Sequence, residues 1–384
     1  MLLTAAAAKA QMVPIGAVGQ GEAGASSEPV YYFAGMDSAG LAVDRETHPD
    51  GAAQWSMFDD AAGAYVDLTA ADTVTVAAEG RYRLTLTAAG TTAEWTCLCF
   101  APQVTVDVAR LDSVNCTNAY LLAQATAASP TYVDPVSGIE QTIGLTLSYE
   151  WTVADTLTIA SADGRATAPS PTDSVLCIVR ATSSAGTWAE DTVRLSAYAV
   201  SADFDYEVRG RDVPHEVSME GAWSAPVEVE LTQKARGSIT AYEWMMGDAA
   251  RLYEKNPVYT FQKSGTYSLT LTVTDERSGC SATSEAKSLT VTDSFVGFPT
   301  AFTPNGDGVN DEFRPSYRSL KSYHLVIMSR WGRVVYETHD PQTGWDGQTS
   351  AGKAPEGTYF YVAKASGYDP GVSFSLKGSL TLIR

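Results

Sequence analysis

Histidine and basic residues are scarce in this sequence, and the motifs by which many enzymes are recognised are missing. Four His occur among 384 residues, and 26 Lys and Arg stand against 45 Asp and Glu, which gives a net charge of −19. H-E-x-x-H, G-x-S-x-G and Walker motifs do not occur. The negative charge disfavours binding to nucleic acid or to an anionic membrane surface. We therefore predict a protein that is not an enzyme and has no nucleic-acid partner.

Paired carboxylates suited to acid/base chemistry are also rare. The adjacent pair that we single out is Asp59-Asp60, which lies in a Gly/Ala-rich stretch after Trp55. We interpret this pair as part of a solvated turn in preference to an acid/base couple. A catalytic dyad assembled across sheets is the alternative.

Long apolar runs are missing after the amino terminus. No later stretch approaches 18 apolar residues, so we predict no membrane-spanning segment in the mature chain. The start, MLLTAAAAKAQ, ends in Ala8-Lys9-Ala10, which has the A-x-A form of a signal-peptidase site. We predict that residues 1–27 are a signal-peptide remnant and linker, with cleavage before Gln11. A disordered Ala-rich tail is the alternative.

The five cysteines include no C-x-x-C pair. Cysteines fit an exported protein, but an odd number leaves at least one thiol unpaired. Cys97 and Cys99 alternate along one predicted strand, so they share a face and suit buried or bridged positions better than a zinc site. A bridge from Cys116 to Cys177 or Cys99 is the first pairing to test.

Alternation of apolar and polar residues is abundant. Runs such as RYRLTLTAAG, VEVELTQ and YSLTLTVTD have a period of two, which is typical of half-buried antiparallel strands. One plan, a strand with a tryptophan followed by an alternating strand, recurs around Trp55, Trp151 and Trp244. The spacing between these repeats matches the length of an immunoglobulin-like sandwich, in which such a tryptophan packs in the core. We predict an all-β fold of tandem β-sandwiches.

Charge divides the chain near Ser294. Residues 295–384 hold nine Lys/Arg and eight Asp/Glu, a net charge of +1, whereas the remainder carries −20. A shift of this size marks a separate C-terminal module. We predict short linkers near residues 103, 200 and 294, and sandwiches at 28–103, 104–200, 201–294 and 295–384.

The third of these modules resembles a known family. The segment YEWMMGDAARLYEKNPVYTFQKSGTYSLTLTVTD is similar to the polycystic-kidney-disease (PKD) domain, although Met246 stands in place of Phe and Ala249 in place of Gly. The resemblance implies a β-sandwich that serves as a spacer or docking surface. The matching residues are Tyr242, Trp244, Gly247, Asp248, Asn256, Pro257, Tyr259, Gly265, Tyr267 and Leu271.

The C-terminal module carries the motifs of another family. In order, they are P-N-G-D-G-V-N-D, R-W-G, W-D-G, G-T-Y-F-Y and a terminal K-G-x-L-x-L-I-R. Together they resemble the gliding-motility-associated C-terminal domain, the type B sorting domain of the Bacteroidota type IX secretion system. The resemblance implies export through the periplasm to the outer-membrane cell surface or the medium. It implies partners in the type IX translocon or among outer-membrane components.

The same resemblance supplies the candidate site residues. It implies a sorting or recognition role for the terminal positions Lys377, Gly378, Leu380, Leu382 and Arg384. It implies a structural role for the motif residues Asn305, Gly306, Asp307, Gly308, Asn310, Asp311, Arg330, Trp331, Gly332, Trp345, Asp346 and Gly347.

The loop around Asn305 allows two interpretations. Its Asn-Gly and Asp-Gly dipeptides tolerate positive φ, which predicts a sharp turn capped by its own side chains. Oxygen ligands from Asn305, Asp307 and Asp311 also suit calcium, although the bidentate Glu of a calcium loop is missing. We expect no cofactor and a structural turn, with calcium as the alternative.

Six Asp-Ser/Thr tripeptides in the first two modules resemble the O-glycosylation motif of Bacteroidota. The alternative is that Asp-Thr-Val is simply how a loop enters a strand. The six hydroxyl residues are Ser38, Thr73, Ser113, Thr156, Ser174 and Thr192.

Three divergent modules before a sorting domain make this chain more similar to small type B proteins of the PorA kind than to giant repetitive adhesins. We predict a non-catalytic cell-surface protein that works with the secretion or envelope-signalling machinery. A surface adhesin for a host protein or glycan is the alternative, and a secreted hydrolase comes third.

Overall fold

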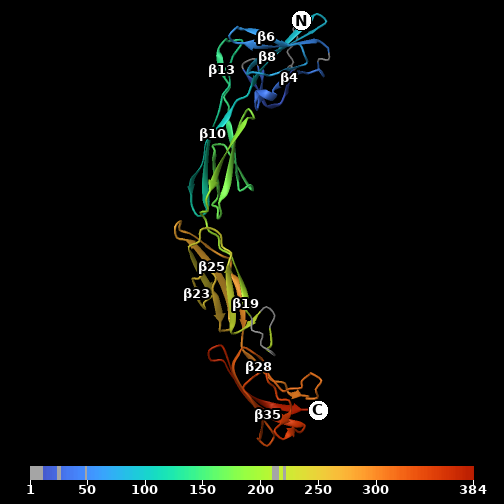
Figure 1. The fold of residues 1–384 in the computed structure, drawn as a ribbon, viewed down its shortest axis with the longest axis vertical. Helices are drawn as coiled ribbons and strands as arrows, with labels where there is room; N and C mark the ends of the chain where they lie inside the picture. Colours follow the sequence, from blue (N-terminus) through green and yellow to red (C-terminus); the bar gives the residue numbers. More distant parts are fainter. Residues whose placement is uncertain (1–11, 24–26, 48–49, 210–215, 219–221) are drawn as a thin grey trace. The chain divides into compact units, whose positions relative to one another are not determined.

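The computed structural model describes residues 12–23, 27–47, 50–209, 216–218 and 222–384 (Figure 1). Apart from one 3-10 turn, η1 (Met36–Ser38), the regular structure of these residues is β-strand, which confirms the predicted all-β fold. The chain divides into two compact units, Met1–Tyr198 and Ala199–Arg384, and each is described by itself. The predicted cleavage before Gln11 lies outside the described residues.

The first module packs a six-stranded sheet against a three-stranded sheet. Its strands are β1 (Met12–Ile15), β2 (Ala17–Ala23), β3 (Glu28–Phe33), β4 (Gly40–Val43), β5 (Ala52–Asp59), β6 (Ala64–Thr69), β7 (Thr73–Thr75), β8 (Gly80–Ala88) and β9 (Thr91–Phe100). The sheet orders are β2-β3-β9-β8-β5-β6 and β1-β4-β7. Because side chains alternate along each strand, Trp55, Leu84 and Cys97 reach one core and are fully buried.

Strands β1 and β2 correct the predicted boundary at residue 28. Met12 on β1 is buried in the core of the first module, and its carbonyl accepts a 3.0 Å hydrogen bond from the Tyr31 hydroxyl. β1 pairs with β4, and β2 pairs with β3. The described part of the predicted linker therefore belongs to the sandwich, because it completes both sheets.

The cysteines of β9 lie as their alternation predicts. Cys97 and Cys99 are buried free thiols on one face, with their Sγ atoms 4.0 Å apart. Burial raises the pKa of the Cys97 thiol well above its usual value. Both positions therefore act as small apolar residues of the core.

The second module packs a three-stranded sheet against a four-stranded sheet. Its strands are β10 (Val104–Val114), β11 (Asn118–Ala127), β12 (Thr131–Val133), β13 (Glu140–Thr142), β14 (Leu147–Val153), β15 (Leu157–Ser161), β16 (Arg165–Pro169), β17 (Val175–Ser183) and β18 (Trp188–Leu195). The sheet orders are β10-β11-β16 and β15-β14-β17-β18, and β12 pairs with β13 as a separate hairpin. Trp151 and Cys177 are fully buried between the two sheets.

The predicted bridge from Cys116 to Cys177 or Cys99 is wrong. Both expected partners, Cys99 and Cys177, are free thiols. Cys177 lies in the core on β17, whereas Cys116 is exposed in the turn between β10 and β11. The spacing of cysteines along the sequence does not reveal that the turn carries Cys116 to the end of the sandwich.

An apolar cluster joins the two modules of the first unit. Tyr32 and Leu98 of the first module are buried in it, and Tyr132 and Leu145 of the second module pack against it. The residues near 103, which we predicted to be a linker, therefore lie inside one compact unit.

A buried ion pair strengthens the same joint. Arg81 on β8 lies 2.9 Å from the Glu28 carboxylate on β3, and the two side chains are 9% and 6% exposed. The guanidinium also donates to the Val133 carbonyl of β12 over 3.0 Å. The charge of Arg81 is thus shared between a carboxylate of its own module and a carbonyl of the next.

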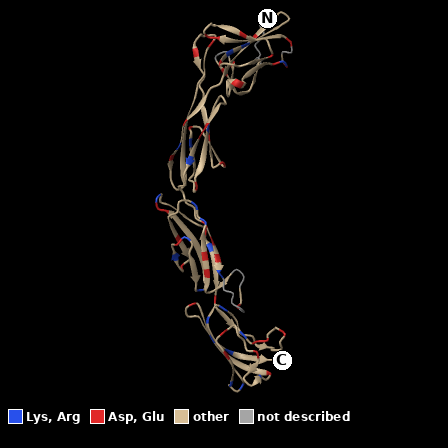
Figure 2. Ribbon diagram, viewed as in Figure 1, with Lys and Arg blue, Asp and Glu red and all other residues tan. Residues whose placement is uncertain are grey.

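The third module packs a three-stranded sheet against a five-stranded sheet with one side strand. Its strands are β19 (Phe204–Arg209), β20 (Trp223–Ser224), β21 (Val227–Gln233), β22 (Ala241–Met246), β23 (Arg251–Leu252), β24 (Val258–Phe261), β25 (Gly265–Asp275), β26 (Cys280–Thr283) and β27 (Lys287–Thr292). The orders are β19-β21-β24 and β20-β27-β25-β22-β23, with β26 beside β25. On the surface, Arg209 pairs with Glu228 and Glu230 at 3.4 and 2.5 Å, so both signs of charge adjoin (Figure 2).

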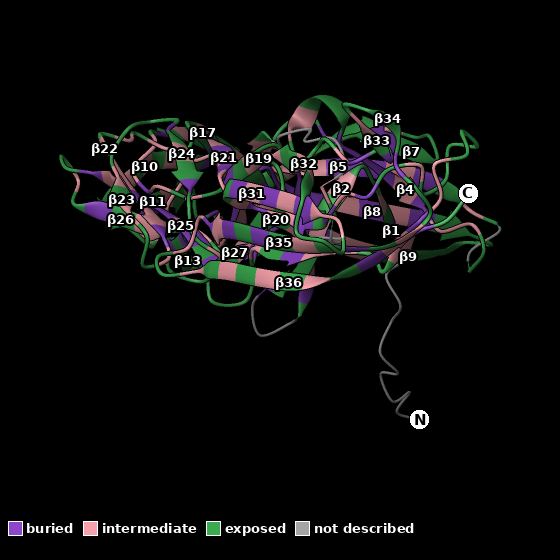
Figure 3. Cartoon of the chain, turned by 90° about the horizontal axis from the view of Figure 1, so that it is seen from below, coloured by how far each residue is buried: buried purple, intermediate pink, exposed green. Residues whose placement is uncertain are grey.

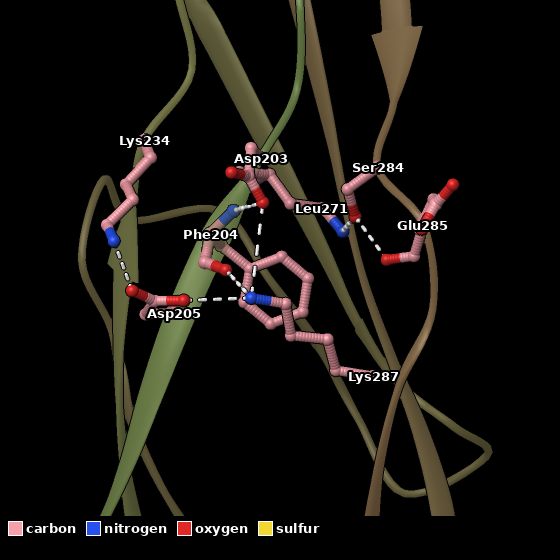
Figure 4. A network of polar contacts seen from close by, with 8 residues as sticks. All are labelled: Asp203, Phe204, Asp205, Lys234, Leu271, Ser284, Glu285 and Lys287. Carbon is pink, nitrogen blue, oxygen red and sulfur yellow. Dashed lines mark hydrogen bonds and ion pairs between the residues drawn. The ribbon is translucent and has the colours of Figure 1, made fainter.

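A lysine links the two sheets of the third module (Figure 4). Lys287 on β27 donates to the Phe204 carbonyl and, over 2.8 Å, to Asp205 on β19. Its ammonium also lies 4.9 Å from the centre of the Phe204 ring. Asp205 accepts a second hydrogen bond from Lys234, and the two lysines lower the pKa of Asp205 to about 2.

The C-terminal module is built on a five-stranded sheet. Its strands are β28 (Phe295–Gly297), β29 (Ala301–Phe302), β30 (Ser316–Arg318), β31 (Leu320–Met328), β32 (Val334–Thr338), β33 (Gln348–Thr349), β34 (Gly352–Lys353), β35 (Gly357–Gly367) and β36 (Ser373–Leu382). The main sheet has the order β29-β36-β35-β31-β32, and β28-β30 and β33-β34 form small ribbons. Burial alternates along β31, β35 and β36, as expected for strands with one face on a core (Figure 3).

The second unit also has a joint between its modules. Ser319 of the C-terminal module is 1% exposed; its hydroxyl donates to the Ala225 carbonyl and its amide to Glu216, both over 2.5 Å. At the tip of the β35–β36 hairpin, Asp369 accepts a 2.8 Å hydrogen bond from the Ser264 amide, and Tyr368 packs on the core of the third module. The predicted linker near 294 thus lies inside a compact unit.

Each module buries one tryptophan completely, and each indole N–H donates to a backbone carbonyl. The distances lie between 2.7 and 3.1 Å. A buried N–H without a partner would cost free energy, so each bond fixes a loop against the core. The pairs are Trp55 with Ala71, Trp151 with Gly164, Trp244 with Glu254 and Trp345 with Gln348.

We expect Arg81→Met to lower the free energy of unfolding of the first unit by about 3–5 kcal/mol, because Glu28 stays buried without its cation. Urea denaturation of the full chain, resolved by hydrogen exchange, measures the change. Adding Glu28→Leu should recover most of the loss. Arg180→Met is the control, because Arg180 pairs with Glu190 at the surface, and its effect should stay below about 1 kcal/mol. Equal effects of the two single variants would contradict the role of burial.

We expect the third module to lose stability as the pH falls from about 4 to about 2. The folded pKa of Asp205 is about 2, below the value of about 3.9 for an unfolded chain, so protonation removes a stabilising contribution that is fully present above pH 4. Asp205→Asn should therefore lower the melting temperature at pH 7 and change it little at pH 2. Glu276→Gln, in an exposed turn of the same module, is the control. A constant effect of Asp205→Asn across this range would contradict the linkage.

Candidate sorting surface

The loop between β29 and β30 folds around its own carboxylates. Both oxygens of Asp311 accept 2.7 Å hydrogen bonds, one from the Gly306 amide and one from the Gly308 amide. Asp307 accepts 2.8 Å and 2.9 Å hydrogen bonds from the Val309 amide and the Asn305 side chain. Gly306 and Gly308 have φ of 84° and 86°, a backbone region that favours glycine. These bonds support the interpretation of the loop as a structural turn.

The same hydrogen bonds affect the pKa of Asp307. The Asn305 side chain and the Val309 amide lower the pKa of Asp307. Among the described residues, no group of three or more His, Cys, Asp and Glu is suited to hold a metal. Calcium at Asn305, Asp307 and Asp311 stays a prediction.

Residues from three of the predicted motifs meet at the end of β36. Arg384 donates to the Ala354 carbonyl over 2.5 Å and to the Gly347 carbonyl over 3.1 Å. A Cβ built on Gly347 would lie 3.1 Å from both Pro304 and Leu382. We call these five residues, Pro304, Gly347, Ala354, Leu382 and Arg384, the Arg384 cluster. Three motifs that lie far apart in the sequence therefore pack together in the folded domain.

The neighbours of the Arg384 cluster are aromatic. Trp345 is fully buried, and its ring centre lies 5.4 Å from that of Phe302 and 4.8 Å from that of Tyr359. Phe313 exchanges backbone hydrogen bonds of 2.9 and 3.1 Å with Trp345. The side chain of Asp346 caps the Gln348 amide over 2.9 Å. The W-D-G motif is therefore part of the core and of a tight loop.

Strand β36 is paired along one edge and open along part of the other. β35 pairs with it from Ser373 to Leu382, whereas β29 pairs only with Thr381 and Leu382. In the part of the chain that the structure describes, no strand pairs with the second edge of residues 373–380. The open edge is therefore the first part of β36, while the end of the strand is paired with β29.

Gly378 lies against an aromatic ring. The Tyr361 ring approaches it from the opposite position on β35. A Cβ on Gly378 would lie 2.8 Å from that ring. Of the other terminal candidates, Leu380 and Leu382 are buried in the core, and Lys377 is exposed.

The R-W-G motif lies in a different place, in the turn between β31 and β32. Gly332 there has φ of 78°, and its amide donates to Ser329 over 2.9 Å. Trp331 is 82% exposed, and the Arg330 guanidinium lies 4.6 Å from its ring centre. This tryptophan is therefore a surface residue, in contrast to the four buried ones.

The six predicted O-glycosylation hydroxyls are all exposed. Their accessibility permits modification, and it also fits residues that enter strands, so glycosylation stays a prediction. The carboxylate of Asp59 accepts hydrogen bonds of 2.9 and 3.1 Å from the amides of Ala61 and Ala62, as expected for a turn.

Comparison with known families decides the identity of the second unit. A model of the CHU_C type IX secretion signal domain matches residues 296–382, and a PKD domain model matches residues 216–291. The chain carries a PKD domain followed by a type IX secretion signal domain. The signal domain supports export by the type IX secretion system, to the cell surface or the medium.

Several solved structures show weak similarity to this chain. A tetra-tandem repeat from the extending region of a large adhesion protein is 15% identical, with 91% of this chain and 98% of that one covered and a TM-score of 0.25. Immunoglobulin domains 1–5 of Sidekick-1 are 16% identical, with 89% of this chain and 75% of that one covered and a TM-score of 0.24. Dimeric latent PorU from Porphyromonas gingivalis is 11% identical, with 75% of this chain and 35% of that one covered and a TM-score of 0.17.

Several contacts of this unit escaped the sequence analysis. Tyr361 covers Gly378, and Ser319 with Asp369 joins the signal domain to the PKD domain. The Asp369-Pro370-Gly371 stretch is a turn signal in the sequence, but nothing in it indicates what the turn contacts. The described residues contain no helix long and apolar enough to cross a membrane.

We expect Asp311→Ala to lower the free energy of unfolding of the signal domain by about 1–3 kcal/mol, because two amides lose a charged acceptor. Thermal unfolding of the full chain with domain-resolved hydrogen exchange measures the change. Asp340→Ala is the control, since one oxygen of Asp340 caps the Gln342 amide, and its effect should be smaller. Calcium or EDTA should leave the melting temperature unchanged; a calcium-dependent rise that Asp311→Ala abolishes would favour the metal alternative.

Proposed function

We propose that this is a non-catalytic cell-surface protein, exported through the periplasm by the type IX secretion system. The match of residues 296–382 to the signal domain carries the proposal. The sandwich modules support it, because their large buried side chains serve packing and their carboxylates serve turns and ion pairs.

We infer that the translocon, or an outer-membrane component, reads strand β36. An open strand edge can take up a strand of a receptor through backbone hydrogen bonds. Residues 373–380 offer such an edge, and Lys377 is exposed within it. Arg384, for which the resemblance implied a recognition role, donates to two carbonyls of its own domain. Lys377 is therefore the cation available for recognition, and Arg384 supports the fold.

We propose further that the protein works with the secretion or envelope-signalling machinery once exported. The alternative of an adhesin for a host protein or glycan stays a prediction. Affinity purification of the full chain from outer membranes, followed by mass spectrometry, distinguishes the two hypotheses. A role with the secretion or envelope-signalling machinery requires recovery of translocon or envelope components.

We expect residues 295–384 to be sufficient for export of a passive reporter that carries a signal peptide. A second fusion with residues 199–384 retains the joint through Ser319 and Asp369, so it controls for misfolding of the shorter fusion. Fractionation of type IX-competent cells and of a type IX mutant measures export. Reporter that stays in the periplasm in both fusions would contradict the proposal.

The final strand should be necessary for export. Truncation after Ser375 removes the buried Leu380 and Leu382, so it tests the strand and the fold together. Lys377→Ala isolates recognition, because this side chain is exposed, and we expect several-fold lower export. Lys364→Ala, an exposed lysine on the neighbouring β35, is the matched control. Equal export of both lysine variants and the parent would rule out Lys377 as a recognition residue.

A further inference from the structure

A cleft of about 620 Å³ opens on the signal domain beside the R-W-G turn. One wall is the turn between β31 and β32, and the other is the β33–β34 ribbon with the segment that follows it. Trp331, Val334, Lys353 and Tyr359 are among its lining residues. Trp331 and Val334 are 82% and 50% exposed, which is unusual for large apolar side chains in an otherwise well-packed module.

The cleft concentrates positive charge on an acidic protein. Arg330, Arg333 and Lys353 line it, and they are exposed. In the part of the chain that the structure describes, none of the three forms an ion pair. One carboxylate, that of Glu356, lines the same cleft. The net charge of the whole chain is −19, so this local excess of cations runs against the general charge of the protein.

Hydrogen bonds to backbone atoms hold the cleft in shape. In the turn, the Ser329 amide donates to Arg333 over 2.8 Å, and the Gly332 amide donates to Ser329 over 2.9 Å. On the floor, Ala354 donates to Gly347 over 2.9 Å and accepts from Arg384 over 2.5 Å. A preformed site loses less entropy on binding than a flexible one.

We propose that this cleft binds an acidic saccharide. The Arg330 guanidinium stacks on the Trp331 ring at 4.6 Å, and the exposure of the indole leaves ring surface free for a sugar to stack on. Arg333 and Lys353 supply donors for the acidic groups, since arginine binds carboxylates and phosphates in bidentate fashion and lysine acts as a point charge. An exposed aromatic ring with unpaired cations around it matches a ligand that is apolar on its ring face and anionic at its substituents.

Sugars that carry carboxylates and sugars that carry phosphates both combine a ring face with anionic groups. Probes of each kind show which of the two the cleft binds. Tetragalacturonate carries carboxylates, mannose 6-phosphate carries a phosphate, and maltotetraose is neutral. A tetra-glutamate peptide carries similar charge without sugar rings. Each probe is titrated into the full chain by isothermal titration calorimetry, at low and at high salt.

We expect tetragalacturonate or mannose 6-phosphate to bind, and maltotetraose and tetra-glutamate to bind at least tenfold more weakly. Trp331→Ala and the double variant Arg333→Ser/Lys353→Ser should each weaken binding at least tenfold. High salt should weaken it as well, because exposed charges are screened. Trp188→Ala is the matched control: Trp188 is 53% exposed with Arg180 at 4.4 Å from its ring centre, but Arg180 pairs with Glu190. This variant should bind like the parent.

The proposal is overturned if no acidic sugar binds at millimolar concentration, or if Trp331→Ala binds like the parent. Binding of tetra-glutamate as tight as that of the sugars would assign the cleft to an acidic peptide and would also overturn it. Unchanged melting temperatures of the variants confirm that they fold, as expected for exposed side chains. Export does not enter these measurements, so their outcome is independent of the proposed function.

Discussion

The burial of one tryptophan in each module is the constraint on which the rest of the structure depends. A large indole stabilises a small sandwich by the area it removes from water, but its N–H must find a carbonyl. In the signal domain this requirement holds Gln348 over Trp345. The loop so fixed presents the Gly347 carbonyl to Arg384. One packing requirement thus positions both the end of the last strand and the floor of the cleft.

The sequence analysis was successful where a local pattern determines the structure. Alternation located most strands, the repeated tryptophans located the cores, and Asn305 to Asp311 located the turn. It failed where the partner lies far along the chain. Nothing near Arg384 indicates that two carbonyls accept from it, and nothing near Gly378 indicates the Tyr361 ring. β29 escaped because it has two residues, too few for a period to appear.

Different interactions join the modules within the two units. In the first unit, an apolar cluster and the buried pair of Arg81 with Glu28 join the sandwiches. In the second unit, neutral and charged side chains such as Ser319 and Asp369 bond to backbone atoms. Both joints rest on residues without a recognisable motif, which explains why sequence reasoning predicted four separate modules and linkers.

The open edge of β36 has a consequence for solubility. Unpaired strand edges are where chains add to one another, and proteins guard them with short strands and charged side chains, lysine above all. The exposed residues of this edge are Ser373, Ser375, Lys377 and Ser379. If two copies joined edge to edge, their Lys377 side chains would lie close together. Their charges would repel each other, because β36 carries no carboxylate to neutralise them. By this argument, Lys377 disfavours the edge-to-edge association of two copies.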